Sequence, residues 1–99
     1  MRTLPTSFRS DGFDYVLLKR EGLAALFQKS KPSHSFPTYE IVWIRQIPTR
    51  ELFGHTSEAH EAMPSSEQWG TYGWTACDLP SAESRFTWLV EKLAKGAEA

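Results

Sequence analysis

The last quarter of the chain carries one helical stripe, which constrains the fold more than any other feature. Its apolar residues recur at i, i+4, i+7, i+8 and i+11: Ala82, Phe86, Leu89, Val90 and Leu93. Such a stripe is typical of a helix that packs one face against a core. Asp78 can cap its start, and Pro80 suits a first helical turn. We therefore predict a helix over about residues 79–95, with a frayed end from Gly96 onward.

Earlier segments have the patterns of strands. Two short apolar runs, residues 13–20 and 23–29, flank Glu21-Gly22 and predict a β-hairpin. Leucine and alanine also favour helix, so a helix over residues 23–28 is the alternative. Residues 39–47 alternate and carry apolar side chains on both faces, which predicts a central strand that ends at Pro48.

The pattern weakens after Pro48. Residues 50–54 are interpreted as a continuation of the ribbon to a turn at Gly54. Residues 64–67 predict a turn or a single helical turn. Alternation returns in residues 71–77, which we expect to form a strand with its aromatic side chains facing inward.

Four strands followed by one helix predict an α+β fold: an antiparallel four-stranded sheet packed on one face by the C-terminal α-helix. The length of 99 residues indicates a single domain over residues 1–99, in which residues 1–12 are expected to be a flexible or loosely docked N-terminal segment. A lone cysteine and the lack of a membrane-spanning apolar run favour a soluble, cytoplasmic protein.

Charge excludes a globally cationic surface. The chain has 11 basic and 12 acidic side chains and a formal net charge of -1. Nucleic-acid binding would therefore need a local patch. One basic set lies in the N-terminal half, and its candidate nucleic-acid contacts are Lys19, Arg20, Lys29 and Lys31.

The segment from Glu67 to Thr75 contains three aromatic residues that are spaced by two glycines. Trp43 and Trp74 are expected to fill the space between sheet and helix, whereas Trp69 and Tyr72 could lie in the core or face a partner. The candidate partner-binding residues are Trp69, Tyr72, Glu58, His60, Glu61 and Glu67.

Catalytic signals are weak. His55 and His60 are five residues apart, which separates their rings on a helix or a strand, so a solvated loop is expected and no metal ligand is assigned. Cys77 is expected to be a buried structural cysteine. We expect no catalytic residue, no cofactor and no enzymatic activity.

Two resemblances concern residues 64–75, whose sequence is PSSEQWGTYGWT. Together with the helix that follows, this segment resembles small uncharacterised proteins of bacteria, phages and other mobile elements. The Trp69-Gly70 pair and Gly73 before an amphipathic helix are also similar to the WGR domain, which binds nucleic-acid ends and protein neighbours. Thr71 stands in place of that motif's arginine, which removes a phosphate-binding cation.

These observations favour a non-enzymatic protein-binding module. The mobile-element resemblance implies an inhibitor that docks on a host defence complex, as an anti-CRISPR protein does, with a Cas or other defence complex as partner and no membrane involved. A WGR-like nucleic-acid-binding domain is the alternative.

Overall fold

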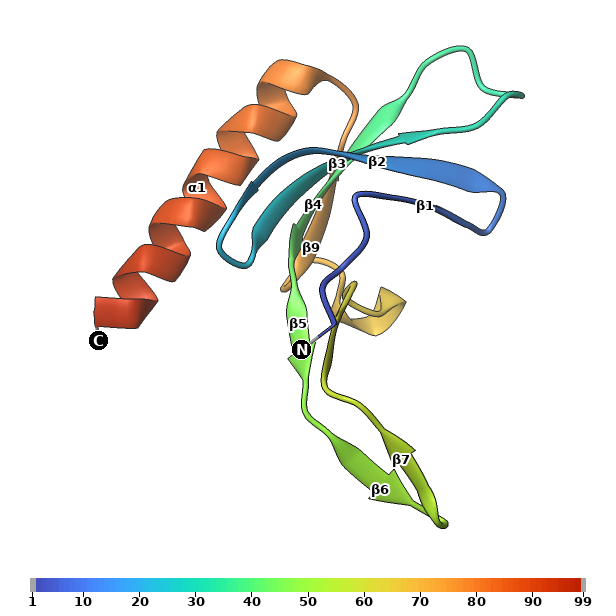
Figure 1. The fold of residues 1–99 in the computed structure, drawn as a ribbon. Helices are drawn as coiled ribbons and strands as arrows, with labels where there is room; N and C mark the ends of the chain where they lie inside the picture. The colour runs from blue at the N-terminus through green and yellow to red at the C-terminus, as the bar shows by residue number, and fades with distance from the viewer. Residues whose placement is uncertain (1, 99) are drawn as a thin grey trace.

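A five-stranded antiparallel sheet carries one C-terminal helix on one face in the computed structural model, which describes residues 2–98 (Figure 1). The strand order is β1-β2-β3-β4-β9. The strands are β1 (Ser7–Ser10), β2 (Phe13–Glu21), β3 (Ala24–Ser30), β4 (Thr38–Trp43) and β9 (Gly73–Ala76). The α+β architecture and the position of the helix are confirmed.

The prediction of four strands is corrected to five. The additional strand, β1, lies within residues 1–12, where the sequence predicted none. Its four residues, Ser-Phe-Arg-Ser, are too few and too polar to show alternation. It forms by pairing with β2 across the turn at Asp11-Gly12, where both residues have positive φ. This turn chemistry is typical of two-residue hairpins.

The hairpin of β2 and β3 is confirmed. β3 covers most of residues 23–28, so the helical alternative for that segment is wrong. Gly22, with φ of 60°, makes the reversal between the strands. The register shifts between Leu17 and Lys19, which indicates a β-bulge in β2.

The C-terminal helix is α1 (Leu79–Glu98), and it extends beyond Gly96. Its start is capped as predicted, because Asp78 Oδ1 accepts a hydrogen bond of 2.8 Å from the backbone N–H of Ser81. The hydrogen bonds from the Ser81 backbone and hydroxyl lower the pKa of Asp78.

Both faces of the sheet are covered. On the helix face, Ala82, Phe86 and Leu89 of α1 pack against a cluster that includes Leu26 and Ile41. On the opposite face the buried residues are Ala25, Phe27, Val42 and Ile44, and the partly buried residues packed against them are Leu4, Phe8, Tyr15, Leu17, Leu23, Met63 and Trp69. β4 contributes to both clusters and lies between two strands, which confirms the prediction of a strand inside the sheet.

The predicted strand over residues 39–47 divides at Ile44. This residue is buried, and its N–H still donates to the Leu23 carbonyl over 2.7 Å, which continues the register of β3 and β4 by one pair. The chain then leaves the sheet as an arm, residues 45–62, that projects away from the sheet and helix (Figure 1).

Two short ladders build the arm. β5 (Arg45–Ile47) pairs with β8 (His60–Ala62), and β6 (Arg50–Leu52) pairs with β7 (His55–Ser57). The radius of gyration is 14.7 Å. A globular chain of this length would have about 13 Å, so the projecting arm accounts for the difference.

After the arm, a single 3-10 turn, η1 (Ser66–Gln68), leads into β9, as the turn prediction for residues 64–67 suggested. Within residues 2–98, no helix has both the length and the apolar character needed to cross a membrane.

Candidate functional site

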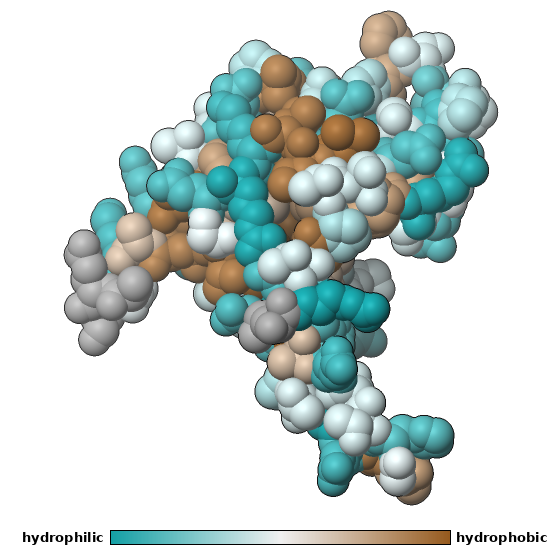
Figure 2. Space-filling view, in the orientation of Figure 1, coloured by the Kyte–Doolittle hydropathy of each residue, from teal (hydrophilic) through white to brown (hydrophobic). Residues whose placement is uncertain are grey.

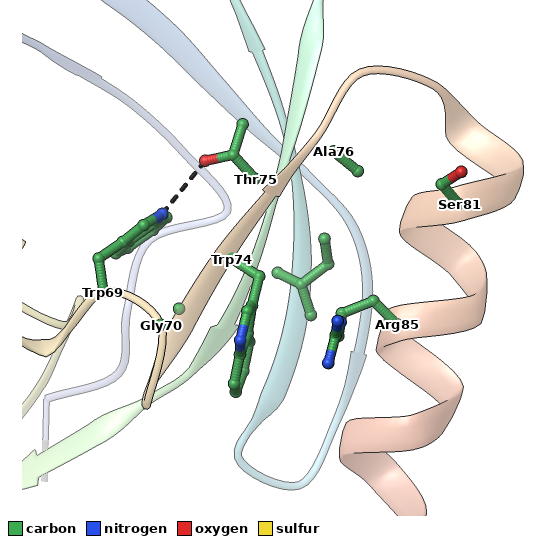
Figure 3. Close-up of a pocket in the computed structure, with 9 residues that line it drawn as sticks. Trp69, Gly70, Trp74, Thr75, Ala76, Ser81 and Arg85 are labelled. Carbon is green, nitrogen blue, oxygen red and sulfur yellow. Dashed lines mark hydrogen bonds between the residues drawn. The ribbon is translucent and has the colours of Figure 1, made fainter.

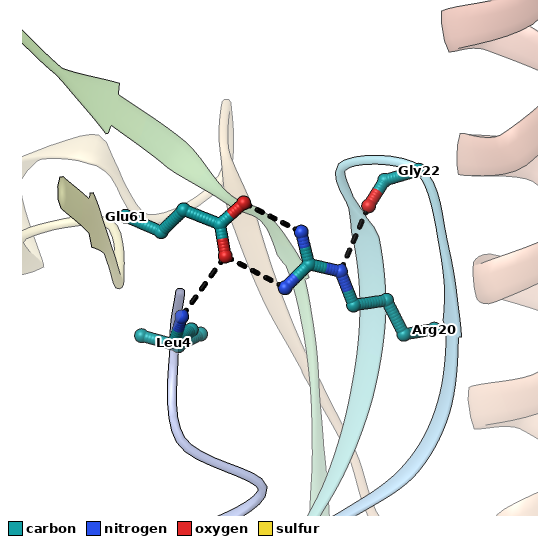
Figure 4. A network of polar contacts seen from close by, with 4 residues as sticks. All are labelled: Leu4, Arg20, Gly22 and Glu61. Carbon is teal, nitrogen blue, oxygen red and sulfur yellow. Dashed lines mark hydrogen bonds and ion pairs between the residues drawn. The ribbon is translucent and has the colours of Figure 1, made fainter. Parts of the chain in front are cut away.

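One ion pair ties the base of the arm to the sheet (Figure 4). The guanidinium of Arg20 donates to both carboxylate oxygens of Glu61, over 2.7 and 2.6 Å, and the N–H of Leu4 adds a third hydrogen bond of 2.9 Å. Arg20 also donates to the Gly22 carbonyl over 2.9 Å. The hydrogen bonds from Arg20 lower the pKa of Glu61 to about 2, against the raising effect of burial. Glu61 therefore joins the arm, the N-terminal segment and the β2–β3 hairpin.

Trp69 folds back over β9. A Cβ added to Gly73 would overlap its ring, so this spacing of tryptophan and glycine allows close packing. The indole Nε1 donates to Thr75 Oγ1 over 3.2 Å (Figure 3). The Thr75 hydroxyl in turn donates to Glu40 over 2.6 Å. Glu40 is 4% exposed and also pairs with Lys29 over 3.2 Å. Trp69 thus covers a buried polar network.

Tyr72 lies on a different side of the sheet from Trp69. Its ring is 4.7 Å from that of Trp43, which packs against the helix-face cluster, whereas Trp69 packs against the cluster on the other face. The guanidinium of Arg45 lies 3.9 Å from the Tyr72 ring centroid. The two aromatic rings expected to contact one partner therefore belong to two surfaces.

The other candidate partner-binding residues are dispersed. Glu58 is exposed on the arm, and its carbonyl lies 2.9 Å from Nδ1 of the half-buried His60. Glu67 is exposed on η1, and the Glu61 side chain is 7% exposed and engaged by Arg20.

The basic set predicted from the sequence is largely engaged within the chain. Lys19 pairs with Glu83, Arg20 with Glu61, and Lys29 with Glu40. Lys31 lies 5.0 Å from the ring centroid of Phe13. Three of the four cations therefore already have carboxylate partners.

The residues considered for metal or nucleophilic chemistry do not converge. His55 lies in β7 and His60 in β8, in separate ladders. Within residues 2–98, no three His, Cys, Asp or Glu side chains are placed to hold a metal ion. Cys77 follows β9 and is exposed, so the prediction of a buried cysteine is wrong. The strand ends at Ala76, and the chain turns toward α1 at the surface.

The most unusual surface feature is the tip of the arm, the turn from Leu52 to His55, which the sequence did not point to. Phe53 is 91% exposed and Leu52 is 57% exposed. Figure 2 shows apolar atoms at this end of a largely polar arm. Residues 50–58 are all exposed, so neither the five-stranded sheet nor α1 covers the tip.

Phe53 is also in an unfavourable conformation. It has φ of 53° and is followed by Gly54 with φ of 78°, between the paired residues Leu52 and His55. Asparagine, aspartate and glycine are preferred at the first position of such a two-residue turn, and a bulky residue there is rare. The signal in the sequence is a Phe-Gly pair where an Asn-Gly or Asp-Gly pair is expected.

A second surface missed by the sequence analysis combines cations and rings along α1. Arg85 lies 4.8 Å from the Trp88 ring centroid and 5.4 Å from that of Trp74, and Lys92 lies 5.0 Å from Trp88. Trp88 is 40% exposed. Among the side chains of residues 2–96, neither Arg85 nor Lys92 forms an ion pair with a carboxylate.

In comparisons with known proteins, no protein-family model, no curated protein and no solved structure matches this chain.

Proposed function

We propose that the chain is a non-catalytic protein-binding module that docks stoichiometrically on a larger protein through the tip of its arm. The observation that supports this proposal is Phe53, a large apolar side chain that is 91% exposed at a position with φ of 53°. Neither the local conformation nor burial within the chain favours phenylalanine there.

The same turn occurs elsewhere in the chain with ordinary chemistry. Asp11-Gly12, between the paired residues Ser10 and Phe13, has φ values of 53° and 81°. A left-handed conformation costs most residues about 1–2 kcal/mol, and aspartate tolerates it better than phenylalanine. The arm therefore retains a residue that weakens its own turn.

A partner would offset this cost. Burial of a phenylalanine side chain contributes about 1.5–3 kcal/mol, which is similar to or larger than the conformational penalty. A two-stranded ribbon is only marginally stable alone, so contact with a partner would also stabilise the arm. The eight residues from Arg45 to Leu52 extend roughly 25 Å, enough for the tip to enter a recess in a larger protein.

The resemblance to mobile-element proteins makes a host defence complex the first partner class to test. Inhibition by docking requires a positioned surface and no catalytic group. The ion pair of Arg20 and Glu61 supplies that positioning, because it holds the base of the arm against the β2–β3 hairpin.

The experiment uses Phe53→Asp, which installs the residue found at Asp11. Two kinds of candidate partner are tested: proteins captured by the tagged wild-type chain, and purified Cas effector complexes. Each is titrated by calorimetry with the wild-type chain and with the variant. We expect wild type to bind one partner per chain. The variant should bind at least about tenfold more weakly, since loss of about 1.4 kcal/mol corresponds to that factor.

Phe36→Asp is the matched control, because Phe36 is 84% exposed in a different loop. It should leave the affinity unchanged. Urea unfolding of Phe53→Asp should show unchanged or increased stability, which separates loss of binding from loss of folding. Equal affinity of wild type and Phe53→Asp would refute docking through the tip. Failure of only the Cas complexes to bind would refute the defence-complex assignment.

A further inference from the structure

A groove of about 400 Å³ lies where the outer edge of β9 faces the start of α1. Trp69 lies on one side of β9, while Trp74 and Arg85 face each other on the other side, between the strand and the helix (Figure 3). Ser81 closes the end of the groove near the first turn of α1. The groove is thus bordered by aromatic rings, a cation and a strand edge.

The strand edge offers backbone hydrogen-bonding groups. β9 is the last strand of the sheet and pairs only with β4 among the strands. The N–H of Trp43 donates to the Tyr72 carbonyl over 2.7 Å, so the backbone groups of Tyr72 face β4. Backbone groups of successive residues in a strand point to opposite sides, so those of Gly73 and Thr75 face outward from the sheet. The Gly73 carbonyl accepts from the Gly70 N–H over 2.7 Å. Alternation leaves the N–H and C=O of Thr75 without a strand partner.

The cation at this edge is available to an anionic group. Arg85 is exposed and lies against the rings of Trp74 and Trp88, and it forms no ion pair with a carboxylate of residues 2–96. A guanidinium that lies against aromatic rings keeps its N–H groups directed outward for a carboxylate. Lys92 adds a second cation beyond Trp88.

We propose that this groove binds an extended acidic peptide segment of a protein partner. The segment adds to the edge of β9, pairs its backbone with Thr75, sets an apolar side chain against Trp74, and places a carboxylate on Arg85. Peptides commonly bind by such strand addition, in which main-chain hydrogen bonds provide affinity and neighbouring side chains provide specificity. The strand edge favours a peptide over a nucleic acid, because only a peptide supplies the complementary N–H and C=O groups.

This inference extends the proposed protein-binding function to a second surface and does not depend on the arm. The probe is a displayed library of short random peptides, selected on the full chain. We expect the recovered peptides to be enriched in aspartate and glutamate. Their affinity should fall at least about tenfold with Arg85→Ala, and it should not change with Arg50→Ala, since Arg50 is an exposed arginine on the arm.

Amide exchange provides a readout of backbone pairing. The Thr75 N–H should exchange at least about tenfold more slowly when a recovered peptide is bound, because the N–H then donates to the peptide. Recovered peptides without acidic enrichment, or with equal affinity for wild type and Arg85→Ala, would overturn the proposal. So would an oligothymidylate that binds through Arg85 without protecting the Thr75 amide.

The two proposals fail separately. Peptides that lose affinity with Phe53→Asp but not with Arg85→Ala would refute the groove and support the arm. Peptides that lose affinity with Arg85→Ala but not with Phe53→Asp would support the groove. The calorimetric experiment with Phe53→Asp and Phe36→Asp then tests docking through the arm separately.

Discussion

Arg20 and Glu61, which are 41 residues apart in the sequence, form a bidentate ion pair at the base of the arm. The sequence suggested Arg20 as a nucleic-acid contact and Glu61 as a protein contact. In the folded chain each is the other's partner, and both are only partly accessible, with side chains 27% and 7% exposed. The pair positions the arm, whose tip stays exposed.

Removal of the Glu61 charge should destabilise the chain. Glu61→Gln loses the charge-assisted hydrogen bonds from Arg20 and leaves a partly buried guanidinium without its carboxylate. We expect a loss of about 1–3 kcal/mol in the free energy of unfolding, measured by urea denaturation. Glu83→Gln is the control, because the Lys19–Glu83 pair is well exposed, with side chains 50% and 43% accessible. That variant should lose less than about 1 kcal/mol. Equal losses in the two variants would contradict a structural role for Glu61.

Stability should fall in acid as Glu61 becomes protonated. Its pKa is about 2 in the folded chain against 4.5 ordinarily, mainly because of the hydrogen bonds from Arg20. The folded state therefore binds fewer protons than the unfolded state between these values. The contribution of Glu61 is complete above about pH 4.5 and is lost as the pH falls toward 2. Urea midpoints measured across this range should decline more steeply for wild type than for Glu61→Gln. Parallel declines would show that other groups control the acid transition.

Gly73 should not accept a side chain. A Cβ at this position would overlap the Trp69 ring, so Gly73→Ala must displace that ring from β9. We expect a loss of about 1–3 kcal/mol from overpacking, together with a changed near-ultraviolet circular dichroism spectrum. Gly96→Ala is the matched substitution, because no atom lies within 4 Å of its added Cβ and alanine favours helix. It should leave stability unchanged or slightly increased. A neutral Gly73→Ala would show that the Trp69 ring can move without cost.

Local patterns were sufficient for the helix and for the hairpins at Gly22 and Gly54. The spacing of Ala82, Phe86 and Leu89 predicted the buried face of α1, and Asp78 marked its start, because capping and helical periodicity depend on residues within a few positions of one another. Gly22 and Gly54 likewise marked reversals with positive φ.

Local sequence patterns could not predict how segments far apart in the chain pair with one another. β1 has too few residues for a pattern of its own and exists through its ladder with β2. Beyond Ile44 the chain pairs with β8 instead of β3, and β8 follows the β6–β7 hairpin in the sequence. Cys77 follows an apolar alternating segment, so its exposure depended on where β9 ends relative to α1.

By itself, the sequence determined one antiparallel sheet, one C-terminal helix and the turns at Gly22 and Gly54, because these follow from the identity of neighbouring residues. Only the tertiary structure decided which charges are neutralised and which rings are covered. It paired Arg20 with Glu61, placed Trp69 and Tyr72 on different faces, and left Phe53 exposed. The physical reason is that burial and ion pairing depend on distances between segments far apart in the chain, which the order of residues does not specify locally.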